Sequence, residues 1–329
     1  MSGSSMNVES PPKLESLPQS RSKAKITVSS NRLKRLQKIH AGAMVMIPFL
    51  GSIAAFAFAF WFGISWIDIG LLVSLYVLTL TGITVGYHRL FSHCAFQAHP
   101  GVRVALAILG SMAFQGPLIY WASNHRRHHQ YSDRGEDPHS PYCDGDRALG
   151  HLHGLWHAQV GWMFSHEITN TFLFAKDLIQ DAPIAKVNQL YYPLLFLGLA
   201  ISPIAGGLLS GSWMGALSGF LWGNCVRVML TYHFTNAINS ISHCYGTRPF
   251  KTREQSTNNL WIAIPTLGES WHNNHHAFPH SAIFGLKWWQ IDFGGWVVRF
   301  LEALGLVWAV KRPSADAIAA KAKSIHQSA

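Results

Sequence analysis

Histidine is the residue type in this chain whose number and spacing point most directly to chemistry. The sequence contains 19 histidines, and the most closely spaced of them form three clusters, HRLFSH, HRRHH and HNNHH. The clusters contain His88 and His93, then His125, His128 and His129, and finally His272, His275 and His276. Neutral imidazole binds Fe, Zn, Cu and Ni well, whereas the four cysteines form no CxxC pair for thiolate ligation. Three repeated clusters therefore indicate a histidine-ligated metal centre.

The spacing within the clusters predicts two metal ions. In an H-x-x-H-H helix the first and last histidines are about 40° apart around the axis, while adjacent histidines diverge by about 100°. Adjacent histidines should therefore face different ions. The predicted division keeps His125 with His129 and His272 with His276, and sets His128 and His275 apart from their neighbours.

Two further features bear on the ligand set. His88 and His93 are five residues apart, so a helix must end or distort between them if they share one ion. Asn239 and His243 lie on one helical face at i, i+4 spacing, which makes His243 a candidate ninth ligand and Asn239 a candidate holder of metal-bound water. The other histidines near the clusters are expected to orient ligands or to bond loops. They are His139, His157 and His280.

The elements that must position these residues are expected to be membrane helices. Hydrophobic residues make up 49% of the chain and charged residues only 13%. Apolar stretches long enough to cross a bilayer occupy residues 41–62, 69–87, 191–208 and 213–232. A fifth stretch, 102–122, is interrupted by Arg103, Gln115 and Pro117, so it should lie at the interface or pack on the cytoplasmic domain. The expected fold is an all-α integral membrane protein with four transmembrane helices and a cytoplasmic helical domain carrying the histidines.

The distribution of basic residues predicts the orientation in the membrane. Residues 1–40 form a polar, basic tail, and the segments 89–186 and 233–329 are also basic, whereas the links within both hairpins of spans carry no Lys or Arg. By the positive-inside rule both termini and the central segment should be cytoplasmic in this multi-pass protein. The net charge of +10 has the same explanation, together with contact to anionic lipid, so nucleic acid is not an expected partner.

The motifs HRLFSH, NHRRHH, NSISHCYGTRPF and GESWHNNHHAFPH resemble the histidine boxes of membrane fatty acyl desaturases of the Δ9 group. That group includes stearoyl-CoA desaturases and the cyanobacterial and bacterial acyl-lipid enzymes, and the resemblance implies that residues 41–329 form one desaturase domain. It also implies a di-iron centre with no bridging carboxylate. One iron would be held by His88, His93, His125, His129 and His275, and the other by His128, His243, His272 and His276, with Asn239 reaching it through water.

The implied activity is the O2-dependent introduction of a cis double bond, at Δ9 by resemblance, into a saturated acyl chain. Two electrons must come from outside, because the chain shows no GxGxxG unit, flavin signature or iron–sulfur spacing. By resemblance the external donor is ferredoxin or cytochrome b5. It is expected to dock near a set of basic residues on the cytoplasmic side. They are Arg126, Arg127, Arg248 and Lys251. Zinc could replace iron in overexpressed protein, since imidazole binds it readily.

Departures from the acyl-CoA members bear on the carrier of the acyl chain. Ser123, Asn124, Asn236 and the acidic or neutral run 165–171 stand where basic or other CoA-binding residues are expected. A glycerolipid is therefore favoured as the carrier, with acyl carrier protein (ACP) or CoA as alternatives. One alternative function is that of a di-iron membrane hydroxylase of lipids. A metal transporter or a haem-binding membrane protein is a less favoured alternative, because either would place histidines within the spans.

Selection of one methylene pair in an alkyl chain requires a fixed head and a capped far end. By resemblance the acyl tunnel runs from the metals into the bundle of spans. Tyr76 and Leu80 precede His88 on the second span and share one helical face, so they are candidates for the tunnel floor. The alternative is that both only pack against neighbouring spans.

Overall fold

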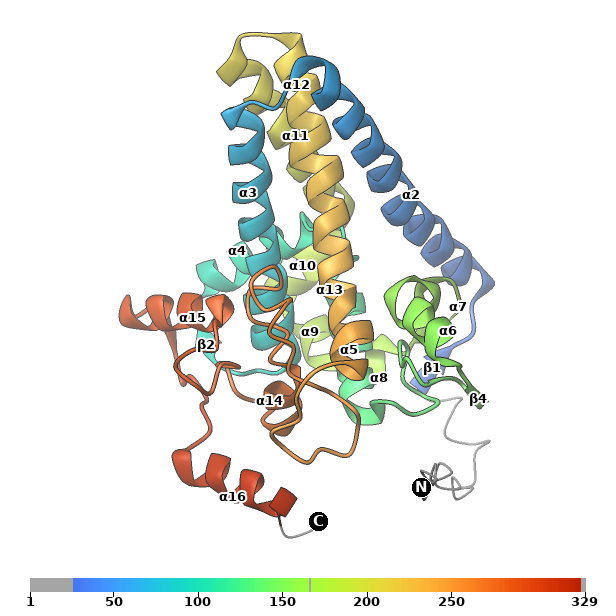
Figure 1. Ribbon diagram of the computed structural model, residues 1–329, viewed down its shortest axis with the longest axis vertical. Coiled ribbons are helices and arrows are strands. Elements are labelled where there is room, and N and C mark those ends of the chain that lie inside the picture. Colours follow the sequence, from blue (N-terminus) through green and yellow to red (C-terminus); the bar gives the residue numbers. More distant parts are fainter. Residues whose placement is uncertain (1–25, 166, 327–329) are drawn as a thin grey trace, which may run out of the picture.

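The computed structural model of the protein describes residues 26–165 and 167–326 (Figure 1). The first 25 residues of the predicted polar tail, residues 1–40, lie outside this range. Helices make up most of the described chain, and its strands form three short antiparallel pairs. The prediction of a mostly helical protein is therefore confirmed.

Three helices in the described chain are long and apolar enough to cross a membrane. They are α2 (Asn31–Phe62), α3 (Trp66–Thr81) continued by the π-helical segment η1 (Gly82–Ser92), and α11 (Tyr191–Ser210). The chain is also helical throughout α12 (Trp213–Phe220), η3 (Leu221–Val226) and α13 (Arg227–Cys244). This last run contains the fourth predicted span, but it does not meet the same criterion of length and hydropathy. A topology of four spans therefore stays a prediction.

Local sequence explains where the long helices begin and end. The Ser30 side chain accepts a hydrogen bond from the Leu33 amide, so α2 begins well before the predicted position 41. Gly63 and Gly211 follow α2 and α11 with positive φ angles of 78° and 66°, which glycine adopts without steric cost. A serine then caps the next helix in each case, so both hairpins have short, defined links.

Shorter helices and loops form the lower half of the molecule in Figure 1. The helices, including one further π-helical segment, η2, are α4 (Pro100–Ser111), α5 (Leu118–Tyr131), α6 (His151–Trp156), η2 (His157–Gly161), α7 (Trp162–Ser165), α8 (Thr171–Phe174), α9 (Lys176–Gln180), α10 (Ala182–Gln189), α14 (His272–Ala277), α15 (Phe293–Ala303) and α16 (Ala315–His326). The paired strands are β1 (Thr27–Val28) with β5 (Ile168–Thr169), β2 (Gln97–Ala98) with β6 (Val307–Trp308), and β3 (Cys143–Asp144) with β4 (Arg147–Ala148). The fifth apolar stretch is therefore divided between α4 and α5, with a break at Gly116 and Pro117.

The long helices α2 and α13 diverge towards the lower half of the molecule. In Figure 1 α2 leans away from α13, and α6 and α7 fill the space between their lower ends. The main hydrophobic core lies where η1, α4, α5 and α10 meet, around buried residues such as Val85, Leu118 and Ile184. Large apolar side chains on α2, such as Phe60 and Trp61, stay exposed, as expected for a helix whose surroundings are lipid.

The contact between η1 and α4 depends on glycine. A Cβ atom added at Gly82 would lie 2.2 Å from the backbone nitrogen of Gly110, and one added at Gly110 would lie 2.3 Å from the Tyr87 ring. A side chain at Gly82 would therefore require the α4 backbone to move, and one at Gly110 would require the buried Tyr87 ring to move. This close approach fixes η1, which carries His88, against the core.

We expect Gly82→Ala to destabilise the protein by about 1–3 kcal/mol, because the added methyl group overpacks this contact. The control is Gly70→Ala in the preceding α3, where a Cβ atom meets nothing within 4 Å. There the gain in helix propensity should leave stability unchanged or raise it by about 1 kcal/mol. Thermal unfolding of both variants in the same detergent measures the difference, and equal midpoints would contradict the packing argument.

Candidate metal centre

Nine histidines from separate parts of the chain converge below the long helices. They come from η1, from the residue that follows η1, from α5, from the end of α13 and from α14. The first histidine group comprises His88, His93, His125, His129 and His275. The second histidine group comprises His128, His243, His272 and His276. Within each group the nearest ring nitrogens all lie within 4.8 Å of one another.

In the first histidine group the Nε2 atoms point at one another. The Nε2 of His275 lies 3.0 Å from that of His88 and 2.9 Å from that of His129, and the Nε2 atoms of His93 and His125 are 2.7 Å apart. Two nitrogens bound at right angles to one metal, each about 2.1 Å from it, are separated by roughly 3 Å. The spacing therefore fits a shared cation.

The second histidine group has the same character. The Nε2 atoms of His243 and His272 are 3.0 Å apart. The Nε2 atoms of His128 and His276 are buried and have no hydrogen-bond partner within the described chain. Buried polar atoms are normally paired, so these two unpaired nitrogens fit ligation of a metal.

The local backbone explains how the ligands are divided. The structure separates the adjacent pairs His128–His129 and His275–His276 between the two groups, as helix geometry predicts. The required distortion between His88 and His93 is also present, because this stretch is π-helical and the His93 amide donates to the His88 carbonyl at 3.1 Å. The wider turn places the two rings 4.9 Å apart, centre to centre. That these groups bind metal stays a prediction.

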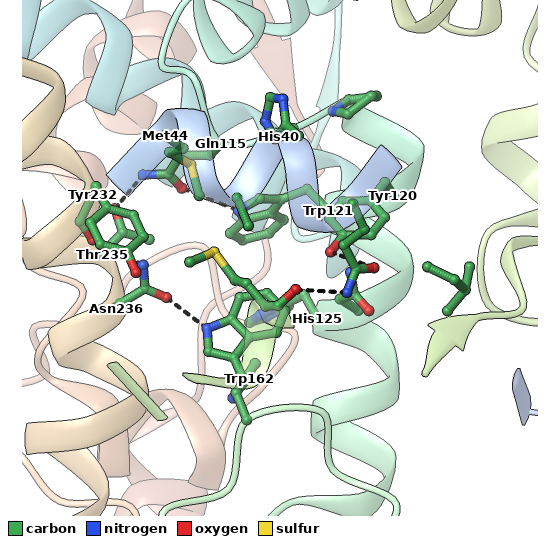
Figure 2. A pocket seen from close by; sticks show the side chains of 18 of the residues that line it. His40, Met44, Gln115, Tyr120, Trp121, His125, Trp162, Tyr232, Thr235 and Asn236 are labelled. Carbon is green, nitrogen blue, oxygen red and sulfur yellow. Dashed lines mark hydrogen bonds between the residues drawn. The ribbon is translucent and has the colours of Figure 1, made fainter. Parts of the chain in front are cut away.

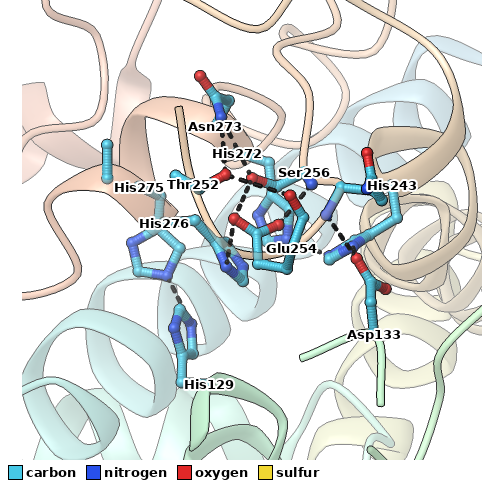
Figure 3. A network of polar contacts seen from close by, with 12 residues as sticks. His129, Asp133, His243, Thr252, Glu254, Ser256, His272, Asn273, His275 and His276 are labelled. Atoms are coloured by element: carbon cyan, nitrogen blue, oxygen red, sulfur yellow. Dashed lines mark hydrogen bonds and ion pairs between the residues drawn. The ribbon is translucent and has the colours of Figure 1, made fainter. Parts of the chain in front are cut away.

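Carboxylates stand behind four of the histidines. The Nδ1 of His88 is hydrogen-bonded to Glu269, that of His128 lies 2.9 Å from Asp137, and that of His243 lies 3.1 Å from Asp133. Glu254 lies behind His276, with its Oε1 3.6 Å from the Nδ1 of that ring, a longer contact than the other three; Figure 3 shows the pair. An Nδ1–H that donates to a carboxylate leaves the Nε2 lone pair directed at the cluster, which is the tautomer a metal requires.

Sequence reasoning missed these four acidic residues. Their signals were weak: Asp133 and Asp137 follow the second cluster closely, and Glu269 precedes the third, in a chain with only 16 acidic residues. Nothing in the sequence distinguishes Glu254. Proximity to a histidine cluster in an acid-poor chain was the available clue.

Burial sets the protonation state of the clusters. It lowers the pKa of His93, His125, His129 and His275 well below the usual value, and neighbouring histidines lower it further. The same causes lower the pKa of His272 and His276. Burial also acts to lower the pKa of His243, but the Asp133 carboxylate outweighs it and raises that pKa. Most of the rings are therefore neutral at pH 7, the form that binds metal.

A buried arginine supports the first histidine group. Arg89 is fully buried, and its Nη2 donates to Glu269 at 3.1 Å and to Asp292 at 2.7 Å. Its guanidinium carbon also lies 3.9 Å from the centre of the Phe284 ring. Arg89 thereby holds Glu269, which in turn holds His88. The sequence analysis did not identify this network.

The remaining predicted residues have separate positions. Asn239 is outside both histidine groups and donates from Nδ2 to Asn236 at 3.3 Å, so its water-mediated role stays a prediction. His139 lies 3.6 Å from Asp137, behind His128, and His280 lies 3.2 Å from the His93 carbonyl. His157 is buried in η2, which packs against α13.

A cavity with two chambers adjoins the histidines. The outer chamber offers about 270 Å³ to the centres of water-sized groups, and the inner chamber about 40 Å³. Trp121, His125, Thr235 and Asn239 line both chambers, so they lie where the two meet, a region called the neck below. Figure 2 shows Trp121, His125 and Thr235 around the outer chamber.

The predicted floor residues differ in position. Leu80 lines the inner chamber, whereas Tyr76 lines neither chamber. Tyr76 lies one turn behind Leu80, and its hydroxyl donates to the carbonyl of Pro265. The place of both residues in the tunnel floor therefore stays a prediction.

Comparison with known proteins gives a consistent result. A sequence model of the fatty acid desaturase family matches residues 64–301. A hex-5-enoyl-[acyl-carrier protein] acetylenase of Moorena producens is 48% identical over 297 residues, which cover 90% of this chain and 92% of that protein. The Delta-9 acyl-lipid desaturase 1 of Arabidopsis thaliana is 36% identical, with 85% of each chain covered. An sn-1 stearoyl-lipid 9-desaturase of Anabaena variabilis is 37% identical over 75% of this chain and 85% of that protein.

We expect Asp137→Asn to weaken metal binding by the second histidine group about 10- to 100-fold, because His128 loses the charged acceptor that orients its ring. Elemental analysis of purified protein after dialysis against a graded chelator measures the metal retained. Asp316→Asn, at an exposed carboxylate on α16, is the control and should match the wild type. Equal retention by all three proteins would contradict the role of Asp137, and a wild type without metal would contradict the centre itself.

Proposed function

Because the chain belongs to the fatty acid desaturase family, we propose that it is an O2-dependent acyl desaturase that inserts a cis double bond into a saturated acyl chain. The observation that carries this proposal is the pair of histidine groups beside the neck of a cavity. The family assignment agrees with the resemblance of the histidine motifs, and the chain is an oxidoreductase.

The proposed cofactor is a pair of iron ions, one in each histidine group, with Asn239 holding a water on the second. The donor set fits, because each of the two groups consists of imidazoles and includes no carboxylate. When bound, such a pair supplies the O2-dependent oxidation that an unactivated C–H bond requires. Zinc would fit the same nitrogens but has no redox change, so zinc-loaded protein would be inactive.

The protein's own residues have three tasks in this proposal. The carboxylates of Asp133, Asp137, Glu254 and Glu269 hold the histidine rings in place. Trp121 and Thr235 lie at the neck, so an alkyl chain that passes between the two chambers lies beside both groups. Burial of the histidines keeps bulk water away from the reacting carbons.

The reaction balances with an external reductant. The acyl chain loses two hydrogens, O2 is reduced to two waters, and the remaining two electrons and two protons come from outside. We propose ferredoxin or cytochrome b5 as the donor. Of the basic residues expected to attract it, Lys251 is exposed, whereas Arg127 is buried and Arg126 pairs with Asp177 at 2.6 Å.

The membrane arrangement is proposed as four spans with both termini and the histidine groups on the cytoplasmic side. Three apolar helices support membrane association. The basic segments that flank them support the orientation.

The position of the double bond and the acyl carrier are finer proposals. Similarity to Δ9 acyl-lipid desaturases favours Δ9 and a glycerolipid. Similarity at 48% identity to an acetylenase whose name specifies a hex-5-enoyl-ACP favours a second candidate, dehydrogenation of an alkenyl chain to an alkyne on a carrier protein. Hydroxylation is the remaining alternative, and mass distinguishes it, since the product would gain oxygen instead of losing two hydrogens.

We expect expression in a host that lacks unsaturated fatty acids to produce a chain lighter by two hydrogens. Lipids and acyl-ACPs from the same cells, separated before analysis by mass spectrometry, show the position of the bond and the carrier. His125→Ala is the inactive control, because it removes a ligand of the first histidine group. A product heavier by one oxygen would overturn desaturation in favour of hydroxylation.

We also expect purified enzyme supplied with acyl substrate, O2 and NADPH alone to be inactive. Ferredoxin with its reductase, or cytochrome b5 with its reductase, should restore turnover, because the described chain has no second redox module. Consumption of NADPH coupled to product formation measures this. Turnover without an added carrier would show that electrons enter by another route.

A further inference from the structure

A group of large apolar side chains is exposed outside the long helices, in the segments before and after α14. Trp261 is 88% exposed, Ile264 66% and Trp288 97%. On α15, Trp296 and Phe300 are exposed one turn apart, while other side chains of the same helix pack on the main hydrophobic core. Exposed apolar groups of this size mark a surface that contacts another apolar body. These five side chains are called the apolar wing below.

Hydrogen bonds and packing join the segments that bear the apolar wing. The Gly294 amide of α15 donates to the Leu267 carbonyl at 3.0 Å. The Trp271 indole donates to the Ile291 carbonyl at 2.8 Å, and Ala263 is buried in the same cluster as Trp271. The turn of residues 260–267, the segment before α15 and α15 itself therefore form one packed unit.

The position of α3 sets the depth of this unit in a membrane. The links between α2 and α3 and between α11 and α12 lie together at the upper end of the molecule in Figure 1, and Trp61, Trp66 and Trp213 beside these links are exposed. Such a belt of tryptophans marks a membrane boundary. Tyr76 follows Trp66 by ten residues on α3, or about 15 Å along the axis. Because the hydrocarbon core is about 30 Å thick, Tyr76 lies near its middle.

Tyr76 holds the turn of residues 260–267 at this depth. Its hydroxyl donates to the Pro265 carbonyl, and in Figure 1 the chain that precedes α14 rises beside α3. The length of one side chain separates Pro265 from the α3 backbone, which is short compared with the half of the core that remains below Tyr76. Ile264 and Trp261 are therefore exposed at the level of the lipid acyl chains.

The composition and the backbone of the turn suit a site without water. Residues 258–268 include no charged side chain. The carbonyls of residues 262–267 each accept a hydrogen bond from within the protein, that of Pro265 from Tyr76 and that of Leu267 from Gly294. Backbone groups at membrane depth must be satisfied by the protein itself, and these paired carbonyls meet that requirement.

The helix α15 lies lower, at the membrane boundary. A Cβ atom added at Gly294 would lie 2.8 Å from the Arg89 guanidinium carbon, and Arg89 follows Trp66 by roughly 30 to 35 Å along α3 and η1. That separation is close to the thickness of the hydrocarbon core. In Figure 1 α15 extends crosswise to α3. It exposes Trp296 and Arg299, and aromatic and basic side chains together are typical of helices that lie in a membrane interface.

We infer that the apolar wing is a second membrane-contact surface outside the four proposed spans. The turn of residues 260–267 inserts its exposed side chains among the lipid acyl chains beside α3, and α15 lies in the interface below it. The partner is the lipid bilayer, which the wing recognises by hydrophobic burial and by basic groups at headgroup level. The inference goes beyond the proposed reaction and rests only on the proposed membrane arrangement. Attachment of the turn to the middle of α3 favours lipid over a second copy of the chain as the occupant.

The test measures which quencher reaches each part of the wing. Full-length protein in phosphatidylcholine nanodiscs bears one added cysteine labelled with the fluorophore bimane, and the parent protein labelled in the same way gives the background from the native cysteines. The quenchers are a phosphatidylcholine with a nitroxide deep in its acyl chain, one with a nitroxide near its headgroup, and iodide in the water. Phe60→Cys, at an 80% exposed position on α2, is the lipid control, and Arg253→Cys, at an exposed position before the turn, is the aqueous control.

We expect Trp261→Cys and Ile264→Cys to be quenched by the deep nitroxide as strongly as Phe60→Cys. Iodide should quench both at least about tenfold less than it quenches Arg253→Cys, because an ion does not enter hydrocarbon. Trp288→Cys, nearer the interface, should respond most to the headgroup nitroxide. All of these side chains are exposed, so their replacement leaves the core packing intact.

Two results would overturn the inference. Strong quenching of the Trp261 and Ile264 variants by iodide would place the turn in water. Quenching by neither lipid nor iodide would show that a second copy of the chain covers it. In both cases lipid quenching of Phe60→Cys would leave the proposed membrane arrangement standing, whereas its loss would overturn that arrangement as well.

Discussion

The convergence of imidazole lone pairs is the interaction on which this structure depends. Nε2 atoms that meet at 2.7–3.0 Å in a buried site are poorly satisfied by one another, because each neutral ring has only one N–H to donate. A bound cation satisfies several of them at once. The arrangement of α5, α13, α14 and η1 around one centre is therefore the one that the proposed metal would require, and the buried carboxylates and Arg89 help to hold the rings in it.

The two histidine groups are supported by different charges. Asp133, Asp137 and Glu254 stand behind members of the second group. Behind the first group stands Glu269, which also pairs with Arg89. The first group thus offers more imidazoles and a partly neutralised carboxylate, and the second offers fewer imidazoles and more negative charge. Each combination would offset the free-energy cost of burying the proposed cation.

Sequence alone predicted what depends on local periodicity. The angles of H-x-x-H-H separate adjacent histidines, and the spacing of His88 and His93 requires a distorted turn, which η1 supplies. Apolar runs predicted the long helices, although the cap at Ser30 moved the start of α2. The partners of Glu254, Arg89 and Tyr76 lie far away in the chain, so no local pattern could indicate them.

One helical run along α3 and η1 connects the inner chamber to the first histidine group. Leu80 and His88 belong to one helical run that continues without a break from α3 into η1. The close contact of Gly82 with Gly110 lies between them and prevents the run from sliding along its neighbour. Leu80 and the first histidine group are therefore held at a fixed separation. Because Leu80 is outside both histidine groups, a change in its size can alter the inner chamber without altering those groups.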